Sequence, residues 1–234
     1  MAKAWDDPRI VKGMTRQLRW RRQLLAAGKK PLGWKLAFGG PAAMQRLQIN
    51  APLVGFLMTD AVMPSGSSTS FSGWKKPAAE PELTVYLKND LGPGADRSTV
   101  MAAIAGLGAA IEVADVDHPS EDVEETLARN IYQRNLILGE CDGSHSGGAL
   151  AGLNARVMLT DKELVNTSDF EALTGELITI VAHVANLLSF FGEALCSGQI
   201  IIAGSITPPI WVQGGDSLVF HLEPQAPISV GFTA

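Results

Sequence analysis

The stretch EPELTVYL, residues 80–87, indicates the fold most directly, because polar and apolar side chains alternate along it as in a half-buried β-strand. Successive side chains of a strand point to opposite faces, so Glu80 and Glu82 project from the same face. Two neighbouring carboxylates repel each other, and a bound divalent cation would remove that repulsion. The pattern alone also fits two solvent-facing residues, so it leaves a metal site and a plain polar strand face both open.

A third carboxylate lies in an apolar stretch further along the chain. Glu112 has apolar neighbours on both sides within AAIEVADV, residues 109–116, which is also typical of a strand. A lone buried carboxylate is costly unless a metal ion or a hydrogen-bonding partner compensates it. Three carboxylates are hard oxygen ligands, which suit Mg²⁺ or Mn²⁺ better than Zn²⁺. We therefore predict a Mg²⁺ or Mn²⁺ site on Glu80, Glu82 and Glu112, with a hydrogen-bonded interior acid as the alternative for Glu112.

Outward from these two stretches, the chain alternates short strand patterns with a few helical ones. Further strands are expected at residues 33–38, 53–57, 135–139, 155–159, 199–203, 217–222 and 228–232. Helices are expected at residues 8–27, 42–47, 98–106 and 171–191, with Ser98 as the cap of the third. The Ser- and Gly-rich segment 64–77 is expected to be a surface loop whose length invites a lid or partner role. Many short strands with few helices predict an α+β fold built on a rolled or barrel-like mixed sheet.

Length and composition predict one folded unit with a small N-terminal appendage. The chain has 234 residues, of which 46% are hydrophobic, and this is enough to bury a core without disulfides or a structural metal. We divide it into an N-terminal helical segment, residues 1–32, and a rolled-sheet domain, residues 33–234, which contains the three carboxylates.

The charge balance and the cysteines exclude several classes of partner and site. A net charge of −5, from 19 basic and 24 acidic residues, argues against nucleic acid or an anionic membrane as a partner. Polar residues interrupt the longest apolar run, so neither a signal peptide nor a membrane span is expected. Cys141 and Cys196 lie far apart, which indicates neither a zinc site nor a disulfide framework and favours a reducing cytoplasm. The four histidines share no spacing typical of zinc ligands, and we expect them to be structural.

Two further charged residues are candidates for catalysis. Lys35 is the only charge in the apolar strand pattern at residues 33–38, and a lysine in a low dielectric can lose its proton or bind a substrate carboxylate. The pattern fits equally well a lysine at a strand edge whose ammonium group reaches solvent. Asp60 follows the strand at residues 53–57 and could orient Lys35 or cap a turn.

Small hydroxyl residues follow the predicted strand at residues 199–203. Ser205 and Thr207 lie in GSITPP, residues 204–209, where hydroxyls and backbone amides beyond a strand end could bind an anionic substrate. A plain turn is the alternative for this segment.

Several motifs occur in an order that is known from one protein family. The N-terminal half contains Gly33-Trp34-Lys35, Met44-Gln45, Glu80-Pro81-Glu82 and Ile111-Glu112-Val113. The C-terminal half contains HVANLL at 183–188, GE at 192–193, GQII at 198–201, GSIT at 204–207 and GD at 215–216. Over residues 14–233 the chain resembles the fumarylacetoacetate hydrolase superfamily, in the branch of 2-oxopent-4-enoate (2-hydroxypenta-2,4-dienoate) hydratases and 4-oxalocrotonate decarboxylases. Each motif is short, and their order and spacing together carry the resemblance.

The resemblance implies a fold, a cofactor and a class of reaction. It implies the mixed β-roll of the family's C-terminal domain, with Mg²⁺ or Mn²⁺ on the three glutamates and a small 2-oxo acid completing the coordination shell. Lys35 matches the family lysine that contacts substrate or moves protons. Asn130, Ser205 and Thr207 match positions that border the family's pocket. The implied activity is that of a lyase, a hydratase or decarboxylase of aromatic-compound catabolism, in a homo-oligomer or beside a homologous partner enzyme.

Three departures from the family pattern keep the reaction open. Leu53 stands where hydratases usually carry an acid after a proline, Arg129 stands where an aspartate is common, and TGEL at residues 174–177 replaces a Gly/His/Pro-type motif. A hydratase without that acid lacks an expected proton-transfer group. The alternatives are hydrolysis of a C–C bond in an acylpyruvate at the same metal site, and a non-catalytic, metal-binding partner subunit.

Overall fold

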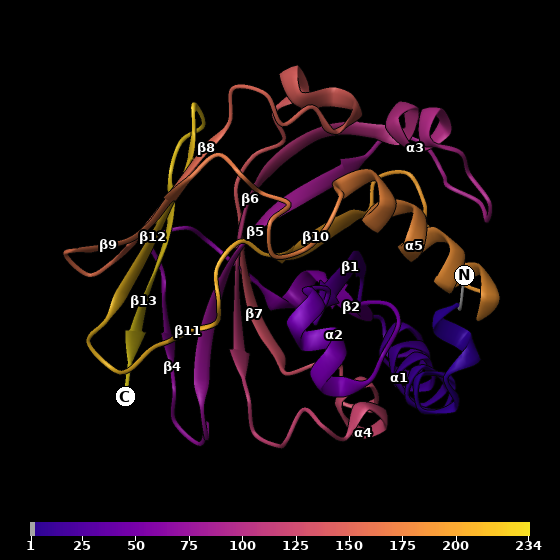
Figure 1. Cartoon of the computed structure of the whole chain (residues 1–234). Helices are drawn as coiled ribbons and strands as arrows, with labels where there is room; N and C mark the ends of the chain where they lie inside the picture. The colour runs from indigo at the N-terminus through magenta and orange to yellow at the C-terminus, as the bar shows by residue number, and fades with distance from the viewer. Residues whose placement is uncertain (1–2) are drawn as a thin grey trace.

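Two β-sheets form the framework of the chain in the computed structural model, which describes residues 3–234. The eight-stranded sheet has the order β2 (Leu53–Met58), β1 (Pro31–Ala37), β10 (Ile200–Ser205), β5 (Pro77–Leu87), β6 (Ile104–Asp115), β7 (Gln133–Leu138) and β3 (Val62–Met63), and β11 (Ile210–Trp211) also pairs with β5. The five-stranded sheet has the order β4 (Ser68–Ser70), β13 (Ile228–Thr233), β12 (Ser217–Glu223), β8 (Asn154–Leu159) and β9 (Lys162–Thr167). Figure 1 shows the first sheet curling across the molecule and the second lying at its left.

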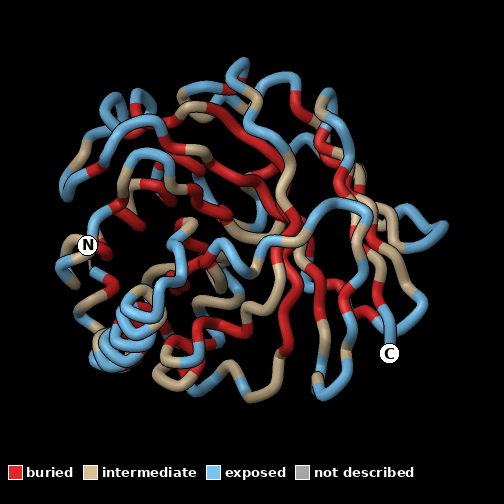
Figure 2. The backbone as a smooth tube through the Cα atoms, turned by 180° about the vertical axis from the view of Figure 1, so that it is seen from behind, coloured by how far each residue is buried: buried red, intermediate tan, exposed pale blue. Residues whose placement is uncertain are grey.

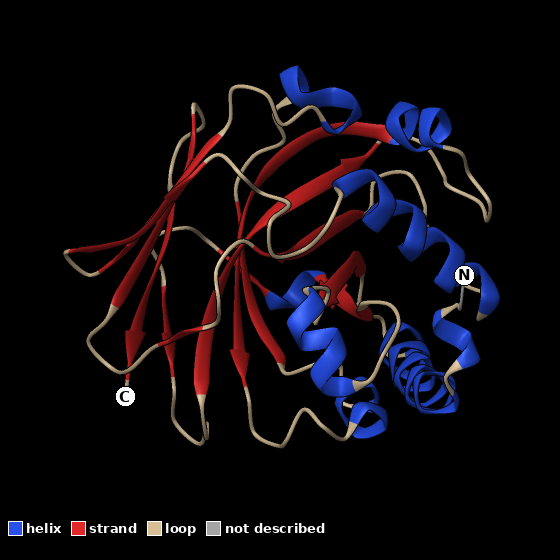
Figure 3. Ribbon diagram, viewed as in Figure 1, coloured by secondary structure: helices blue, strands red, loops and turns tan. Residues whose placement is uncertain are grey.

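The helices gather on the side of the molecule away from the five-stranded sheet (Figure 3). They are α1 (Pro8–Ala26), α2 (Pro41–Leu47), α3 (Arg97–Ala103), α4 (Val123–Ala128) and α5 (Leu177–Phe190), with short 3-10 turns at Ala4–Asp6, Thr59–Ala61 and Gly143–Gly148. The sheets contain both parallel and antiparallel pairs, for example β1 with β10 and β5 with β6. This confirms the predicted α+β fold built on a curled, mixed sheet. No helix among residues 3–234 is long and apolar enough to cross a membrane.

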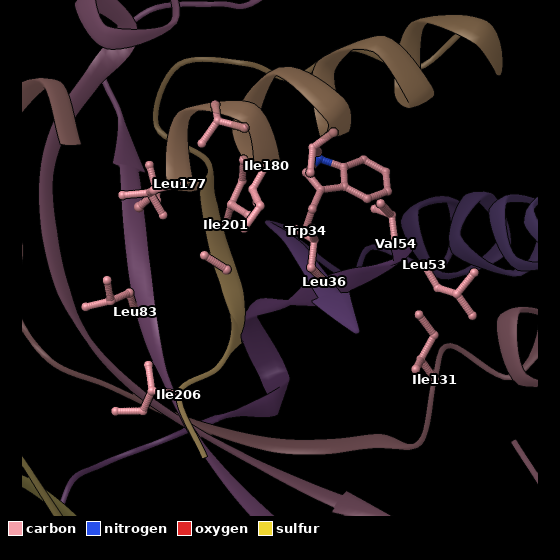
Figure 4. Packing of buried hydrophobic residues seen from close by; sticks show 14 of the residues in the cluster. Trp34, Leu36, Leu53, Val54, Leu83, Ile131, Leu177, Ile180, Ile201 and Ile206 are labelled. Atoms are coloured by element: carbon pink, nitrogen blue, oxygen red, sulfur yellow. The ribbon is translucent and has the colours of Figure 1, made fainter. Parts of the chain in front are cut away.

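The core lies on both faces of the curled sheet, and β5 and β6 are buried along nearly their whole length (Figure 2). On one face, Trp34 of β1 lies beneath α5, beside Ile180 and close to Ile201 of β10 (Figure 4). Because side chains alternate along a strand, Lys35 points to the opposite face, away from α5. That opposite face carries a smaller apolar cluster around Ile202 and the carboxylates described below.

Two predicted helices are shorter than expected. The third begins after Asp96, whose Oδ1 accepts a hydrogen bond from the Thr99 amide at 2.7 Å, so the assignment of Ser98 as its cap was wrong. Its last predicted turn is strand instead, because Ile104 pairs with Leu87 across the sheet. The long helix begins at residue 177 rather than 171, since Gly175 has a φ of +89°, which a right-handed helix does not allow.

The segment 64–77 is not a free loop. Residues 68–70 form β4, which pairs in parallel with β13 and joins the segment to the five-stranded sheet, so a mobile lid is not supported there. Helix α4 and strand β9 were not predicted; α4 packs against the distant helix α1, whereas β9 forms a hairpin with β8, the strand that precedes it. Strand β1 begins at Pro31, and we keep the division into residues 1–32 and 33–234 as a proposal.

Candidate metal and substrate site

The three predicted metal-binding carboxylates meet on one face of the curled sheet. Glu80 and Glu82 lie on β5, and Glu112 lies on β6 directly opposite Glu80 in the antiparallel register. Directly paired residues of two strands point to the same face, so the pairing brings the three side chains together. Their carboxylate oxygens lie within 4.8 Å of one another. Glu82 and Glu112 are fully buried, and Glu80 is partly accessible from a cavity.

Burial makes these carboxyl groups hard to ionise. Desolvation raises the pKa of Glu112 to about 7, an effect that the positive charge of Lys35 opposes. The pKa of Glu82 is raised well above its usual range, first by desolvation and then by the neighbouring charges of Glu112 and Glu80. Desolvation also raises the pKa of Glu80. Desolvation and like-charge repulsion both raise these pKa values, and the positive charge of a bound divalent cation would lower them again.

Lys35 extends from β1 into the carboxylate cluster. Its Nζ donates hydrogen bonds to Glu112 Oε1 and, at 3.0 Å, to the backbone oxygen of Ile131. The side chain is only 1% exposed, and β1 lies between β2 and β10, so the alternative of a lysine reaching solvent at a strand edge is wrong. A buried ion pair of this kind holds both charges in place.

The carbonyl that binds Lys35 belongs to an unusual segment of backbone. Asn130, Ile131 and Tyr132 have φ values of 58°, 51° and 64°, three consecutive left-handed residues, none of which is glycine. Such conformations are costly and persist where the surrounding structure fixes them. Here the Asn130 side chain fixes the turn: its Oδ1 accepts from the Phe56 amide at 2.8 Å, and its Nδ2 donates to the Phe56 oxygen at 2.9 Å.

Asn130, predicted to border the substrate pocket, uses its side chain to bind the backbone of a neighbouring strand. The side-chain amide of Asn130 binds the backbone of β2 as a neighbouring strand would. Asn130 is not among the residues that line the cavity. Ile131 and Tyr132, its neighbours, line the cavity instead. Asn130 therefore positions the turn that carries the Ile131 carbonyl.

Asp60, predicted either to orient Lys35 or to cap a turn, lies in a turn and makes no contact with Lys35 Nζ, whose partners are Glu112 and Ile131. Asp60 is exposed in the 3-10 turn after β2, where its Oδ2 accepts from Lys29 Nζ at 2.6 Å. Lys29 precedes Lys35 by six residues, on the order of 20 Å along an extended chain. Asp60 is a surface ion-pair partner, remote from the carboxylate cluster.

Ser205 and Thr207 lie at the cavity, on the side of β10. Ser205 is the last residue of β10 and pairs directly with Glu82, so the strand ends two residues later than predicted and includes Ser205. The amide of the preceding Gly204 donates to Glu82 Oε2 at 2.8 Å. Thr207 Oγ1 donates to the Pro208 oxygen at 2.8 Å, which holds the loop after β10 against the cavity.

The cavity has a volume of about 790 Å³ and joins the carboxylate cluster to the surface. Lys35, Glu80, Glu82, Ser205 and Thr207 line its inner end. Four residues that we had not singled out for a site also line it: Arg46, Lys76, His118 and Trp211. His118, expected to be structural, binds Asp117 Oδ1 through Nδ1 at 2.6 Å. No local sequence pattern marks these four residues, because separate loops and strand ends bring them together.

The residues of the cluster fit a small divalent cation. Glu112 Oε2 is buried and has no hydrogen-bond partner among the described residues. Such an atom is expensive to leave unpaired, and a cation between the three carboxylates would satisfy it. Three carboxylate oxygens with room for further oxygen ligands match the preference of Mg²⁺ and Mn²⁺.

Comparison with known proteins places the chain in a family, although no family model matches it. It is 31% identical over 183 residues to the 2-hydroxypent-2,4-dienoate hydratase of Pseudomonas putida, covering 76% of this chain and 81% of that protein. It is 28% identical over 232 residues to a 4-oxalocrotonate decarboxylase of the same species, covering 97% and 88%.

A solved structure agrees with these relatives. The 4-oxalocrotonate decarboxylase of Pseudomonas putida G7, complexed with magnesium and adipate, superimposes with a TM-score of 0.84 at 27% identity, covering 92% of this chain and 83% of that one. The decarboxylase and this chain thus share the curled-sheet fold described above. The chain belongs to the fumarylacetoacetate hydrolase superfamily, in the branch of the 2-hydroxydienoate hydratases and 4-oxalocrotonate decarboxylases.

Proposed function

We propose that this chain is a divalent-metal-dependent lyase, a hydratase or decarboxylase, that acts on a small 2-oxo or 2-hydroxydienoic acid in the breakdown of aromatic compounds. The observation that carries the proposal is the buried cluster of Glu80, Glu82 and Glu112, with Lys35 bound to it, at the inner end of the cavity. The relatives of this branch support the class of substrate.

The three glutamates would hold Mg²⁺ or Mn²⁺, with Glu112 contributing its unpaired Oε2. The metal would supply Lewis acidity toward the oxygens of a bound 2-oxo acid. The Gly204 amide fixes the carboxylate of Glu82, and Lys35 fixes that of Glu112. Ligands whose orientation is set by such partners hold a metal in one geometry.

Lys35 is the group that we propose to move a proton. Its Nζ lies between Glu112 and the Ile131 carbonyl, and the side chain also lines the cavity. It can therefore hold a proton at Nζ beside the reacting carbons of a bound acid, or donate a hydrogen bond to the oxygen on which charge develops. Ser205, opposite Glu82, supplies a hydroxyl at the same end of the cavity.

Asp60 does not replace the acid that hydratases usually carry at the position of Leu53. Leu53 is 1% exposed and packs in the core (Figure 4), while Asp60 lies on the surface. Proton transfer in this chain would then depend on Lys35 and on water in the cavity. This is why both hydration and decarboxylation belong in the first assay.

The experiment is turnover of the purified chain, with and without Mg²⁺, on 2-hydroxypenta-2,4-dienoate and separately on 4-oxalocrotonate, followed by loss of ultraviolet absorbance. The proposal predicts Mg²⁺-dependent decay of at least one substrate, abolished in Glu112→Gln and retained in Glu163→Gln, a matched change at an exposed residue of β9. Turnover that does not depend on Mg²⁺, or that survives in Glu112→Gln, would overturn the metal assignment. Mg²⁺ binding without turnover of either substrate would favour the hydrolase or the partner subunit.

A further inference from the structure

The N-terminal helix α1 carries a buried amide that the proposed chemistry does not use. Gln17 lies in the middle of α1 and is completely buried. Its Nε2 donates hydrogen bonds to the backbone oxygen of Leu127 at 2.8 Å and to that of Val54 at 3.2 Å. Its Oε1 is buried and has no hydrogen-bond partner among the described residues. Such a half-satisfied amide adds little net stability, because the unpaired oxygen offsets what the hydrogen bonds contribute. Stability alone therefore does not explain a glutamine at this position.

One of the two oxygens belongs to the turn that binds Lys35. Leu127 lies near the end of α4, and its oxygen accepts a second hydrogen bond, from the Asn130 amide at 2.9 Å. Asn130 is the first of the three left-handed residues, and the next, Ile131, presents its carbonyl to Lys35 Nζ. Gln17 therefore holds the chain at the point where the left-handed turn begins.

The other oxygen belongs to the strand that supports the aliphatic stem of Lys35. Val54 precedes Gly55 on β2, and Gly55 pairs directly with Lys35 of β1. A Cβ at Gly55 would lie 2.9 Å from Lys35 Cγ, closer than real side chains approach, so the stem passes directly over this glycine. Lys35 thus rests on β2 while its Nζ reaches the turn.

Helix α1 can hold these two parts of the chain together because it packs very closely against α4. A Cβ at Gly13 would lie 2.6 Å from Leu127 Cβ and 2.8 Å from the Glu124 oxygen. Residues four positions apart lie on the same face of a helix, so Gly13 and Gln17 both face α4. This close contact fixes the place of the Gln17 side chain relative to the end of α4.

We infer that Gln17 is a positioning residue for Lys35, and that α1 thereby helps to set the rate of the reaction. This inference rests on the proposed function, because the position of Lys35 matters only if its Nζ acts on the substrate. By joining Val54 to Leu127, Gln17 sets the separation between the strand that supports the lysine stem and the turn that binds Nζ. Without this link the turn can shift and misplace Nζ relative to a bound acid. The cavity lining, which includes none of Gln17, Val54 and Leu127, would keep its composition.

The substitution Gln17→Met tests the inference, because methionine has a similar volume but cannot donate to either carbonyl. The assay uses whichever of the two substrates is turned over. We expect kcat to fall about tenfold and KM to stay within about twofold, since the group that moves the proton is displaced while the binding surface is kept. An unchanged kcat would overturn the inference.

Two variants of the same helix serve as controls. Gln23→Met makes the same chemical change at an exposed residue of α1 and should leave kcat unchanged. Ile10→Val removes one methyl group from a buried side chain of α1, so it lowers stability without removing a hydrogen bond to either carbonyl. It should also leave kcat unchanged, and a loss equal to that of Gln17→Met would overturn the positioning role.

The double variant Gln17→Met/Asn130→Ala asks whether the two residues act through the same turn. If they do, their effects on kcat should be less than multiplicative, because each substitution alone already releases the turn. Fully multiplicative effects would overturn the shared action. If Gln17→Met does not fold, Gln17→Asn replaces it in every comparison, since its amide is one methylene group too short to bridge both carbonyls, and a smaller fall in kcat is expected.

Hydrogen exchange gives a readout that does not depend on turnover. The amides of Asn130 and Ile131 donate to the oxygens of Leu127 and Thr126, each at 2.9 Å. Their exchange, measured by mass spectrometry on peptides that contain the turn, should be faster in Gln17→Met than in the wild-type chain or in the two controls. Unchanged exchange would overturn the inference.

Failure of the inference and failure of the proposed function give different results. Mg²⁺-dependent turnover by the wild-type chain, with an unchanged kcat in Gln17→Met, overturns the inference alone. A wild-type chain that turns over neither substrate overturns the proposed function, and the effect on rate inferred for Gln17 fails with it.

Discussion

The ion pair of Lys35 with Glu112 is the interaction on which the site depends at the scale of single residues. Both side chains are almost completely buried, and Glu112 keeps one oxygen without a partner. A buried pair contributes little net stability, but removal of one partner leaves an uncompensated charge. The effect of mutating Lys35 should therefore depend on whether Glu112 is ionised.

We predict that Lys35→Met lowers the free energy of unfolding of the metal-free chain by about 3–5 kcal/mol at pH 8.5. At pH 6 the loss should be smaller, because a carboxyl group with a pKa of about 7 can then take up a proton. Urea denaturation at both pH values measures this. Lys162→Met, at an exposed residue of β9, should cost less than about 0.5 kcal/mol. Equal losses for Lys35→Met at the two pH values would contradict the account.

The raised pKa values also predict proton release on metal binding. A carboxyl group whose pKa rises on folding, from 4.5 to about 7 for Glu112, binds more protons in the folded chain. Its contribution to stability therefore falls as the pH rises through this range. A metal ion must displace those protons, so we expect Mg²⁺ binding to release protons, and to release more of them at pH 6.5 than at pH 8.5. Calorimetric titrations in two buffers of different ionisation enthalpy count the protons; a binding heat independent of buffer at pH 6.5 would show the prediction to be wrong.

At the scale of elements, the left-handed turn at residues 130–132 links β2 to the site. The Asn130 amide pairs with both backbone groups of Phe56, and the turn presents the Ile131 carbonyl to Lys35. Asparagine also tolerates a positive φ better than most residues. Replacing Asn130 therefore removes its hydrogen bonds to Phe56 and also a residue suited to the left-handed conformation.

We predict that Asn130→Ala lowers the free energy of unfolding by about 1–3 kcal/mol and lowers kcat more than it raises KM. The loss in kcat is expected because Lys35 loses a fixed hydrogen-bond partner while the cavity lining is kept. Chemical denaturation and steady-state kinetics, on whichever of the two assayed substrates is turned over, provide the two readouts. Asn154→Ala, which removes a hydrogen bond between two exposed side chains, is the control. It should change neither the free energy of unfolding nor kcat by much. An unchanged kcat for Asn130→Ala would show that Asn130 does not position Lys35 for the reaction.

The sequence predicted those elements whose determinants are local. Alternation placed Glu80 and Glu82 on one strand face, and helical spacing gave α1, α2 and most of α5. Errors arose where distant partners decide the structure. Ile104 is strand because Leu87 lies opposite it, and β4 exists because β13 does.

The candidate site was predictable to the same extent. The three glutamates and Lys35 stood out as charges in apolar strands, and the structure brings them together. The contacts of Asp60 and Asn130 could not be foreseen, because their partners, Lys29 and the backbone of Phe56, are not visible in the local sequence. Arg46 and Lys76 were missed because exposed basic residues are ordinary in sequence and become informative only when they line a cavity.

At the scale of the whole molecule, the curled sheet gathers residues from distant parts of the chain at one cavity. Strands β1, β5, β6 and β10 supply Lys35, the glutamates and Ser205, and the loops around them supply the outer wall. The expected homo-oligomer, a homologous partner enzyme and a cytoplasmic location remain predictions. The function proposed for this cavity depends on a divalent cation that binds between three carboxylates of two neighbouring strands, β5 and β6.

Anomalous diffraction from crystals soaked in Mn²⁺ tests that claim most directly. We predict one strong manganese peak between the carboxylates of Glu80, Glu82 and Glu112, with Glu112 binding through Oε2, and no peak there in Glu112→Gln. A manganese peak elsewhere, or none between these carboxylates, would contradict the account.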